Sequence, residues 1–124
     1  MLSGLPAISA IDFSDNNGSL DQPPNVVVLY ADQWRRQALG TYGNEVVNTP
    51  NLDQLGREGM VFDRMYATNP VCAPDRASLL TGRYPHEHGV ITNNIRLPEE
   101  EVALPEVFRN VGYDTAFLGK WHLD

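Results

Sequence analysis

The sequence NVVVLYAD at residues 25–32 is the strongest indicator of fold class in this chain. Its apolar, mostly β-branched residues run without alternation, which predicts a strand buried on both faces, as in a parallel α/β sheet. Asp32 follows this strand directly, and open α/β sheets bind ligands at the carboxyl ends of their strands. We therefore expect an α/β fold with a ligand site beside Asp32.

Downstream of this strand, three helices and two further strands are expected. Each helix has a proline near its start and a glycine at its end, which is the usual asymmetry of helix ends. The helix that begins at Pro105 also has apolar residues at the spacing i, i+3, i+4 and i+7. The expected helices cover residues 50–58, 74–81 and 105–111, and the expected strands cover residues 25–30, 60–66 and 113–118.

This order, β-α-β-α-α-β, is not a finished fold, because strands buried on both faces need helices on both sides and more neighbours in the sheet. We expect residues 25–124 to be the N-terminal part of a larger α/β domain. Residues 1–24 are rich in turn formers, have no hydrophobic period and end in Pro23-Pro24. We interpret them as a disordered leader.

The composition excludes several classes of protein. The 124 residues carry a formal net charge of −7, which argues against a nucleic acid or an anionic membrane surface as partner, because both demand clustered lysine and arginine. A single cysteine allows no internal disulfide, and no apolar run approaches the roughly 20 residues of a membrane span. The first ten residues lack a basic region and contain Pro6, so we expect no secretory signal. This favours the cytoplasm and leaves the periplasm or secretion open if the N-terminus is incomplete.

The only cysteine, Cys72, lies in the sequence VCAPDRASLLTGR at residues 71–83. A cysteine that precedes a proline-initiated helix sits at the positive end of that helix, which favours anionic ligands. Arg76 in the first turn can direct its guanidinium at a pair of anionic oxygens. These residues suggest an anion site that contains a nucleophile, although a lone cysteine is more often a buried structural thiol.

Two motifs resemble the type I sulfatase family. The first is Cys-x-Pro-x-Arg followed by Thr-Gly, which begins at Cys72. The second is GYDTAFLGKWH at residues 112–122, which contains the only lysine, Lys120. The resemblance extends over residues 25–123. It implies an alkaline-phosphatase-like α/β sandwich with a mostly parallel central sheet and flanking helices, of which this chain is an N-terminal fragment.

In that family the cysteine is not used as a thiol. The resemblance implies that a formylglycine-generating maturation enzyme, which recognises Pro74 and Arg76, oxidises Cys72 to formylglycine. The aldehyde hydrates to a geminal diol. One hydroxyl attacks the sulfur of a sulfate ester and displaces the alcohol, and loss of the proton from the other hydroxyl then expels sulfate and regenerates the aldehyde. Asp75 departs from the pattern, because the family commonly has a small residue there, and its carboxylate must point away from the anion or pair with a cation.

The resemblance also implies a metal and a set of binding residues. Asp32 resembles the first ligand of a Ca²⁺ ion (or Mg²⁺), which polarises the sulfate. Gln33 stands where many members have a second aspartate, and a subset resembling choline sulfatase and the phosphonate monoester hydrolases also has glutamine there. The predicted site comprises Asp32, Gln33 and Cys72 at the metal, Cys72, Arg76, Lys120 and His122 in catalysis, and Lys120, His122 and Asn93 at the substrate.

The expected function is that of a sulfatase, a sulfuric ester hydrolase that acts on a sulfated small molecule or glycan. Two alternatives stay open. The pair Asp32-Gln33 and Asn93 slightly favour a phosphonate or phosphate ester, and Gln33 with Asp75 also permits a truncated module without catalysis. The resemblance places further metal ligands beyond residue 124, so we expect little or no turnover from the 124-residue chain alone. His86 and His88 are expected either in a loop or behind the residues that line the site, since two histidines without a third ligand are poor evidence for a transition metal.

Overall fold

The computed structural model describes residues 23–124 and divides the chain into two units, Met1–Tyr30 and Ala31–Asp124. In the first unit the described residues, 23–30, contain neither helix nor strand. The predicted leader, residues 1–24, lies outside the described residues except for its last two prolines. Every predicted site residue belongs to the second unit.

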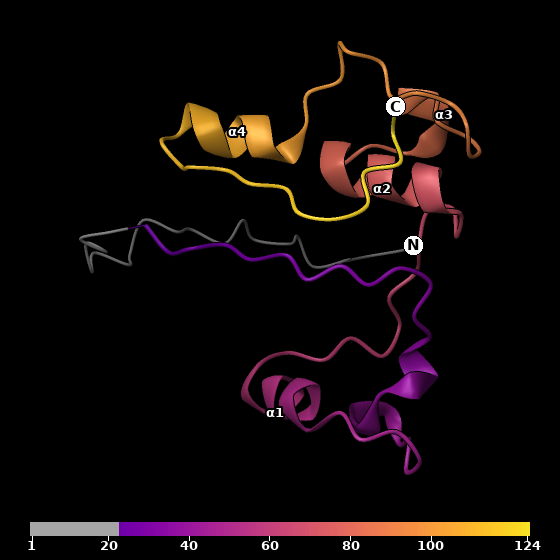
Figure 1. Ribbon diagram of the computed structural model, residues 1–124, viewed down its shortest axis with the longest axis vertical. Coiled ribbons are helices and arrows are strands. Elements are labelled where there is room, and N and C mark those ends of the chain that lie inside the picture. Colours follow the sequence, from indigo (N-terminus) through magenta and orange to yellow (C-terminus); the bar gives the residue numbers. More distant parts are fainter. Residues whose placement is uncertain (1–22) are drawn as a thin grey trace, which may run out of the picture. The chain divides into compact units, whose positions relative to one another are not determined.

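Six helical segments are present in residues 23–124, and the four α-helices are labelled in Figure 1. The other two are single turns of 3-10 helix. The bounds are η2 Arg36–Ala38, η3 Gly40–Tyr42, α1 Pro50–Glu58, α2 Cys72–Thr81, α3 Pro85–His88 and α4 Leu104–Asn110.

Helix α1 confirms the prediction for residues 50–58, with Thr49 as N-cap and Gly59 as C-cap. Asp53 in its first turn accepts hydrogen bonds from the Thr41 backbone N–H at 2.7 Å and from the Thr49 hydroxyl at 3.0 Å. These bonds tie η3 to the start of α1. Gly40 permits the contact, because a Cβ at that position would overlap the Asp53 carboxylate.

Helix α2 begins two residues before its predicted start, so Cys72 is its first residue and does not precede it. Pro74, which was predicted to be first, is third. A proline is accepted throughout the first turn, because the first backbone N–H groups of a helix have no partner within it. The helix ends at Gly82 as predicted. The φ of Gly82 is 68°, in the left-handed region, and its N–H bonds to the Ser78 carbonyl.

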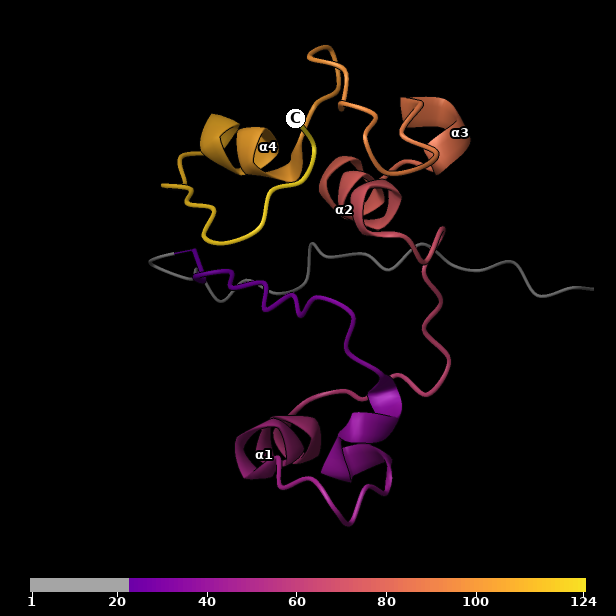
Figure 2. The same cartoon turned by 45° about the vertical axis from the view of Figure 1, so that its right-hand side comes forward.

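Helix α4 begins at Leu104, one residue before the predicted Pro105. The loop expected around His86 and His88 is instead the short helix α3, because Pro85 and Gly89 act as its start and stop signals. Helix α3 packs against α2, and α4 also contacts α2 (Figures 1 and 2). None of the helices in the described part of the chain has the length and apolar character that crossing a membrane requires.

The buried core of the second unit centres on α2. Ala73 and Ala77 on that helix are fully buried and pack with Val90, Leu97 and Leu123. The Leu97 N–H donates to the Leu123 carbonyl at 3.0 Å, which links the C-terminal segment to the segment that follows α3. Four residues of α2 are buried, whereas α1 and α4 have none. Cys72 therefore extends from the most deeply packed helix of the unit.

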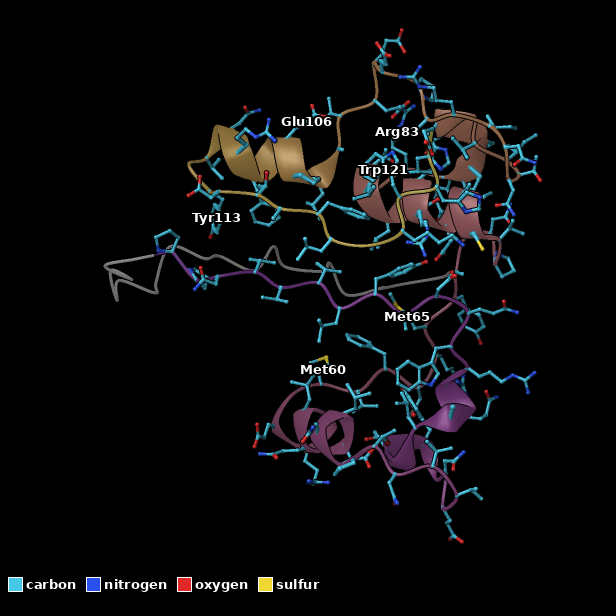
Figure 3. All side chains as sticks on the ribbon, viewed as in Figure 1. Met60, Met65, Arg83, Glu106, Tyr113 and Trp121 are labelled. Carbon is cyan, nitrogen blue, oxygen red and sulfur yellow. The ribbon has the colours of Figure 1, made fainter. Side chains whose placement is uncertain are left out.

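No strand is present in residues 23–124, so the predicted sheet is not formed within them. A strand is defined by hydrogen bonds to a neighbour, and the segments 25–30, 60–66 and 113–118 have no such neighbour in this range. Their apolar side chains are accordingly exposed, to 79% for Leu29 and 94% for Leu118. Met60 and Met65, which follow α1, are exposed as well (Figure 3).

Candidate active site

The first turn of α2 is capped from a distance. Val71 is the N-cap residue, and its apolar side chain makes no capping hydrogen bond. An N-cap side chain usually serves the second or third amide of the helix. Here the third residue is Pro74, which has no N–H, so only the Ala73 amide remains. The Asn93 side-chain Oδ1 accepts a hydrogen bond from the Ala73 N–H at 3.0 Å. Asn93, predicted at the substrate, thus holds the backbone next to Cys72.

Asp32 lies at the centre of a cluster of charged side chains. Its Oδ1 accepts a hydrogen bond from Arg76 Nη2 at 3.2 Å, and its Oδ2 accepts one from Lys120 Nζ at 3.2 Å. The Cys72 Sγ lies 3.9 Å from the Asp32 Oδ1. Four predicted site residues, from three separate parts of the sequence, therefore meet around one carboxylate.

Arg76 connects two sides of this cluster. Its side chain is only 9% exposed, and its Nη1 donates to the Lys120 backbone carbonyl at 3.0 Å in addition to the bond from Nη2 to Asp32. A planar guanidinium can direct N–H groups at two acceptors in fixed directions, which an ammonium group does not reproduce. Arg76 therefore fixes the backbone of Lys120 relative to α2.

The cationic neighbours of Asp32 lower the pKa of its carboxyl below the ordinary value of 3.8. The hydrogen bond from Lys120 is the largest cause, and the hydrogen bond and charge of Arg76 act in the same direction, against partial desolvation. Asp32 is therefore ionised at neutral pH, and one carboxylate faces two cationic side chains. The local charge and not the net charge of the chain decides what a site attracts, so this positive excess suits an anionic ligand.

His122 and Gln33 have left-handed backbone conformations. The φ angle is 59° at His122 and 45° at Gln33, in a region that few residues other than glycine and asparagine adopt. The chain is therefore not extended at His122. The His122 Nδ1 is buried and has no hydrogen-bond partner within the described residues. An unpaired buried polar atom costs about 1–3 kcal/mol, so a functional partner is a natural explanation.

The cluster thus joins Asp32, Cys72, Arg76 and Lys120, and the remaining predicted residues are related to it by one hydrogen bond or by their place in the sequence. Asn93 reaches the residue after Cys72 through its bond to Ala73. Gln33 follows Asp32 in the chain, and His122 comes two residues after Lys120. Asp75, which departs from the family pattern, lies in the first turn of α2, where the helix dipole stabilises a carboxylate.

His88 has a structural position that the sequence analysis missed. It is buried, its Nδ1 accepts a hydrogen bond from the Val90 N–H at 3.1 Å, and its Nε2 lies 3.1 Å from Ser78 Oγ. Because a backbone N–H only donates, the ring is neutral and its proton is on Nε2. Burial lowers the pKa of His88, which favours the same state. His88 therefore links α3 to α2. The spacing of Pro85 and Gly89 around it is the signal that could have indicated a helix.

The oxygen donors at Asp32 suit a hard cation. The Asp32 carboxylate and the Gln33 amide offer oxygen ligands, which Ca²⁺ and Mg²⁺ prefer, and Ca²⁺ takes about six to eight of them. Within residues 23–124 there is no group of three or more histidine, cysteine, aspartate or glutamate side chains that could hold a metal ion. The residues present therefore fit one part of the coordination shell of such a cation.

Comparison with known proteins gives a consistent result. A family model described as Sulfatase matches residues 24–124. The chain is 49% identical over 106 residues to an ulvan-active sulfatase from Formosa agariphila, which covers 84% of this chain and 21% of that relative. It is 39% identical over 132 residues to an N-acetylgalactosamine-6-sulfatase from Rattus norvegicus, which covers 96% of this chain and 25% of that relative. The chain therefore spans between a fifth and a quarter of the length of these curated relatives.

The likeness extends to the backbone. A solved structure of a protein in complex with its substrate, D-glucosamine-2-N,6-O-disulfate, superposes with a TM-score of 0.68 and 40% sequence identity. The superposition covers 70% of this chain and 18% of the solved one. The superposed part of the chain therefore has the fold of the corresponding part of that protein.

Proposed function

Since this chain belongs to the sulfatase family, we propose that it carries the nucleophile of an enzyme that hydrolyses a sulfate ester to an alcohol and sulfate. One observation carries the proposal: Arg76 and Lys120 face a single carboxylate, Asp32, directly beside Cys72 Sγ. Preorganised cations next to a nucleophile are the arrangement that captures an anionic ester and stabilises the charge that develops on it.

In this proposal a maturation enzyme converts Cys72 to formylglycine, which supplies the nucleophile. The start of α2 supports this role, because the dipole of a helix stabilises negative charge at its N-terminus. Arg76 holds the Lys120 backbone, and the Lys120 ammonium binds one sulfate oxygen. His122, whose Nδ1 has no partner within residues 23–124, hydrogen-bonds the ester or the nucleophile.

A divalent cation, Ca²⁺ or Mg²⁺, belongs to the same proposal. Asp32 and Gln33 would be two of its oxygen ligands, and the cation would polarise the ester. Calorimetric titration of the full-length protein with Ca²⁺ tests this assignment without an activity assay. Asp32→Asn is expected to weaken Ca²⁺ binding at least tenfold. Metal affinity falls by about 10- to 100-fold even when the changed residue only hydrogen-bonds to a metal ligand. Asp114→Asn, at an exposed aspartate outside the cluster, is the control and should bind as the wild type does.

We propose a sulfated sugar as the class of substrate. The relative from R. norvegicus is named for N-acetylgalactosamine, and the solved structure holds a glucosamine disulfate. Both ligand names describe an amino sugar. Release of sulfate from a panel of sulfated monosaccharides by the full-length protein tests this proposal, and aryl sulfates without a sugar serve as the comparison.

The central sheet is also part of the proposal. The segments 25–30 and 113–118 have the β-branched and apolar composition of buried strands. We propose that they pair in a mostly parallel sheet when neighbouring strands are present. Slow amide exchange across residues 26–30 in the full-length protein would agree with this, and rapid exchange there would contradict it.

Intact mass spectrometry tests the central claim most directly. After co-expression with a maturation enzyme, the peptide that contains residue 72 should be about 18 Da lighter than the unmodified sequence, because a CH₂SH group becomes CHO. Cys72→Ala is the matched control and should show no such loss. A full-length protein that keeps an unmodified thiol and hydrolyses no sulfate ester would instead be a non-catalytic member of the family.

A second candidate function, hydrolysis of a phosphonate or phosphate ester, is favoured by one observation. Gln33 follows Asp32 where many sulfatases have a second carboxylate. Because glutamine is neutral, the site has less negative charge to repel a phosphoryl group, which is more highly charged than a sulfate ester. Rates on sulfate and phosphonate esters of the same alcohol decide between the two. A higher kcat/KM on the phosphonate ester would replace the main proposal with this one.

A further inference from the structure

We propose that Asn93 is a positioning residue that fixes Cys72 through the backbone of Ala73. The proposal rests on the proposed function of Cys72 and adds a residue that acts through the helix and not through the substrate. Its basis is the hydrogen bond from the Ala73 N–H to Asn93 Oδ1, at 3.0 Å, across a sequence separation of 20 residues.

The first turn of α2 depends on this acceptor because it has no local substitute. Val71 has no side-chain oxygen with which to cap the helix, and Pro74 has no N–H to be capped. The Ala73 amide is the one that a cap can serve, and Ala73 is fully buried. A buried amide has no access to water as a replacement partner. Asn93 therefore supplies the hydrogen bond that keeps the residue beside Cys72 in the helix.

The segment that carries Asn93 is itself attached to α2 at its other end. His88, at the start of this segment, lies 3.1 Å from Ser78 Oγ on α2. Val90, between the two attachments, is fully buried in the core with Ala73 and Ala77. The acceptor oxygen of Asn93 is therefore held in place by a packed segment, as a group that positions another residue must be.

The position of Cys72 matters because its side chain must meet both the ester and the charged cluster. Cys72 is the first residue of α2, and its Sγ lies 3.9 Å from Asp32 Oδ1. Unwinding of the first turn would move this side chain away from Asp32 while the rest of the helix stayed packed. Displacement of a reacting group by about 1 Å can lower a rate by about 100-fold.

Two substitutions at position 93 separate positioning from substrate contact. Asn93→Ala removes the acceptor, whereas Asn93→Asp keeps an oxygen that can cap Ala73, because aspartate and asparagine are equally good caps. Aspartate lacks the amide donor and adds a negative charge. If Asn93 bound the anionic ester, Asn93→Asp would be at least as harmful as Asn93→Ala and would raise KM. The adjacent Asn94, exposed and with a φ of 64°, offers the control Asn94→Gly.

Two measurements on the full-length protein complete the test. Hydrogen exchange of the Ala73 amide should become about tenfold faster in Asn93→Ala and return to the wild-type rate in Asn93→Asp. In the converted enzyme, kcat should fall about tenfold or more in Asn93→Ala at a KM within about twofold of the wild type, and Asn93→Asp should recover most of it. Asn94→Gly should change neither quantity.

The outcomes distinguish this proposal from the function on which it rests. If the wild type hydrolyses no ester, but Ala73 exchange responds to the two variants as expected, the proposed function fails and the capping role of Asn93 stands. Unchanged Ala73 exchange in Asn93→Ala overturns the positioning role whatever the activity. Loss of kcat in Asn93→Asp together with a raised KM overturns it in favour of substrate contact.

Discussion

The Lys120 ammonium donates a hydrogen bond to the Asp32 carboxylate over 3.2 Å, although 88 residues separate the two in the sequence. The second oxygen of the same carboxylate is bound by Arg76, whose guanidinium also holds the Lys120 carbonyl. Asp32, Arg76 and Lys120 therefore form a closed ring of contacts, and removal of one member changes the environment of the other two.

Lys120→Met is expected to raise the pKa of the Asp32 carboxyl toward 3.8, because the Lys120 hydrogen bond is the largest cause of its lowering. A carboxyl whose pKa is lowered by folding stabilises the folded state at pH values above its pKa in the unfolded chain. This contribution is lost as the pH falls through the pKa in the folded state. Lys120→Met should therefore weaken the pH dependence of stability below about pH 4. NMR titration of labelled aspartate carboxyl groups measures the pKa directly. Arg96→Met, at an arginine outside the ring, is the control, and an equal shift in that variant would contradict the assignment.

Arg76→Lys is expected to lower the free energy of unfolding by about 2 kcal/mol, because hydrogen bonds to charged groups contribute about 1.5–3 kcal/mol and lysine cannot replace the two-sided guanidinium. The Arg76 side chain is only 9% exposed, so water cannot replace its lost acceptors, although the half-exposed Asp32 carboxylate stays partly hydrated. Urea unfolding measures the difference. Arg96→Lys is the matched control, since its ion pair with Glu99 is exposed on both sides and such pairs contribute little. Equal effects in the two variants would contradict the role given to Arg76.

His88→Gln is expected to reduce the loss of stability at acidic pH. Burial lowers the pKa of His88 in the folded state below its ordinary value of 6.5, so the neutral ring stabilises the fold above pH 6.5 and this stability is lost as the pH falls below it. Protonation of Nδ1 would also remove the acceptor of the Val90 N–H. Urea midpoints at about pH 5 and about pH 8, the two ends of the range in which histidine titrates, should differ less in His88→Gln than in the wild type. The exposed His86 gives the control His86→Gln, which should keep the wild-type difference.

Gly82→Ala is expected to lower the free energy of unfolding by about 1–2 kcal/mol, because the left-handed conformation is unfavourable for a residue with a Cβ. The φ of Gly82 is 68°, and no atom lies within 4 Å of the position that a Cβ would take, so backbone strain is the only cost. Gly82→Asn is the matched variant and should cost less, because asparagine tolerates this conformation. Thermal unfolding compares the two, and an equal loss in both would show that strain at φ is not the cause.

Helices α1, α2 and α4 were predictable because their signals are local. Pro50 with Gly59, and Gly82 at the end of α2, act within a few residues of the bonds that they form or prevent. The start of α2 was missed by two residues because a proline is compatible with any position of the first turn. The predicted strands are not formed in residues 23–124, since a strand needs a partner and the local sequence cannot supply one.

The identity of the site residues came from motif resemblance, but their connections did not. No local pattern shows that Arg76 reaches both Asp32 and the Lys120 carbonyl, because these bonds depend on how three distant segments pack. The bond from Ala73 to Asn93 is of the same kind. What the sequence does contain is the need for such a bond, since Val71 and Pro74 leave one amide of the helix without a local partner.

The positive φ angles of Gln33 and His122 place two opposing demands on this chain. Glycine at either position would relax the backbone, and strain of this type is worth about 1–3 kcal/mol. It would also delete a side chain that the proposed chemistry uses. Selection for heat resistance alone should therefore favour glycine at these two positions. Each such variant is expected to gain thermal stability and to lose catalytic activity.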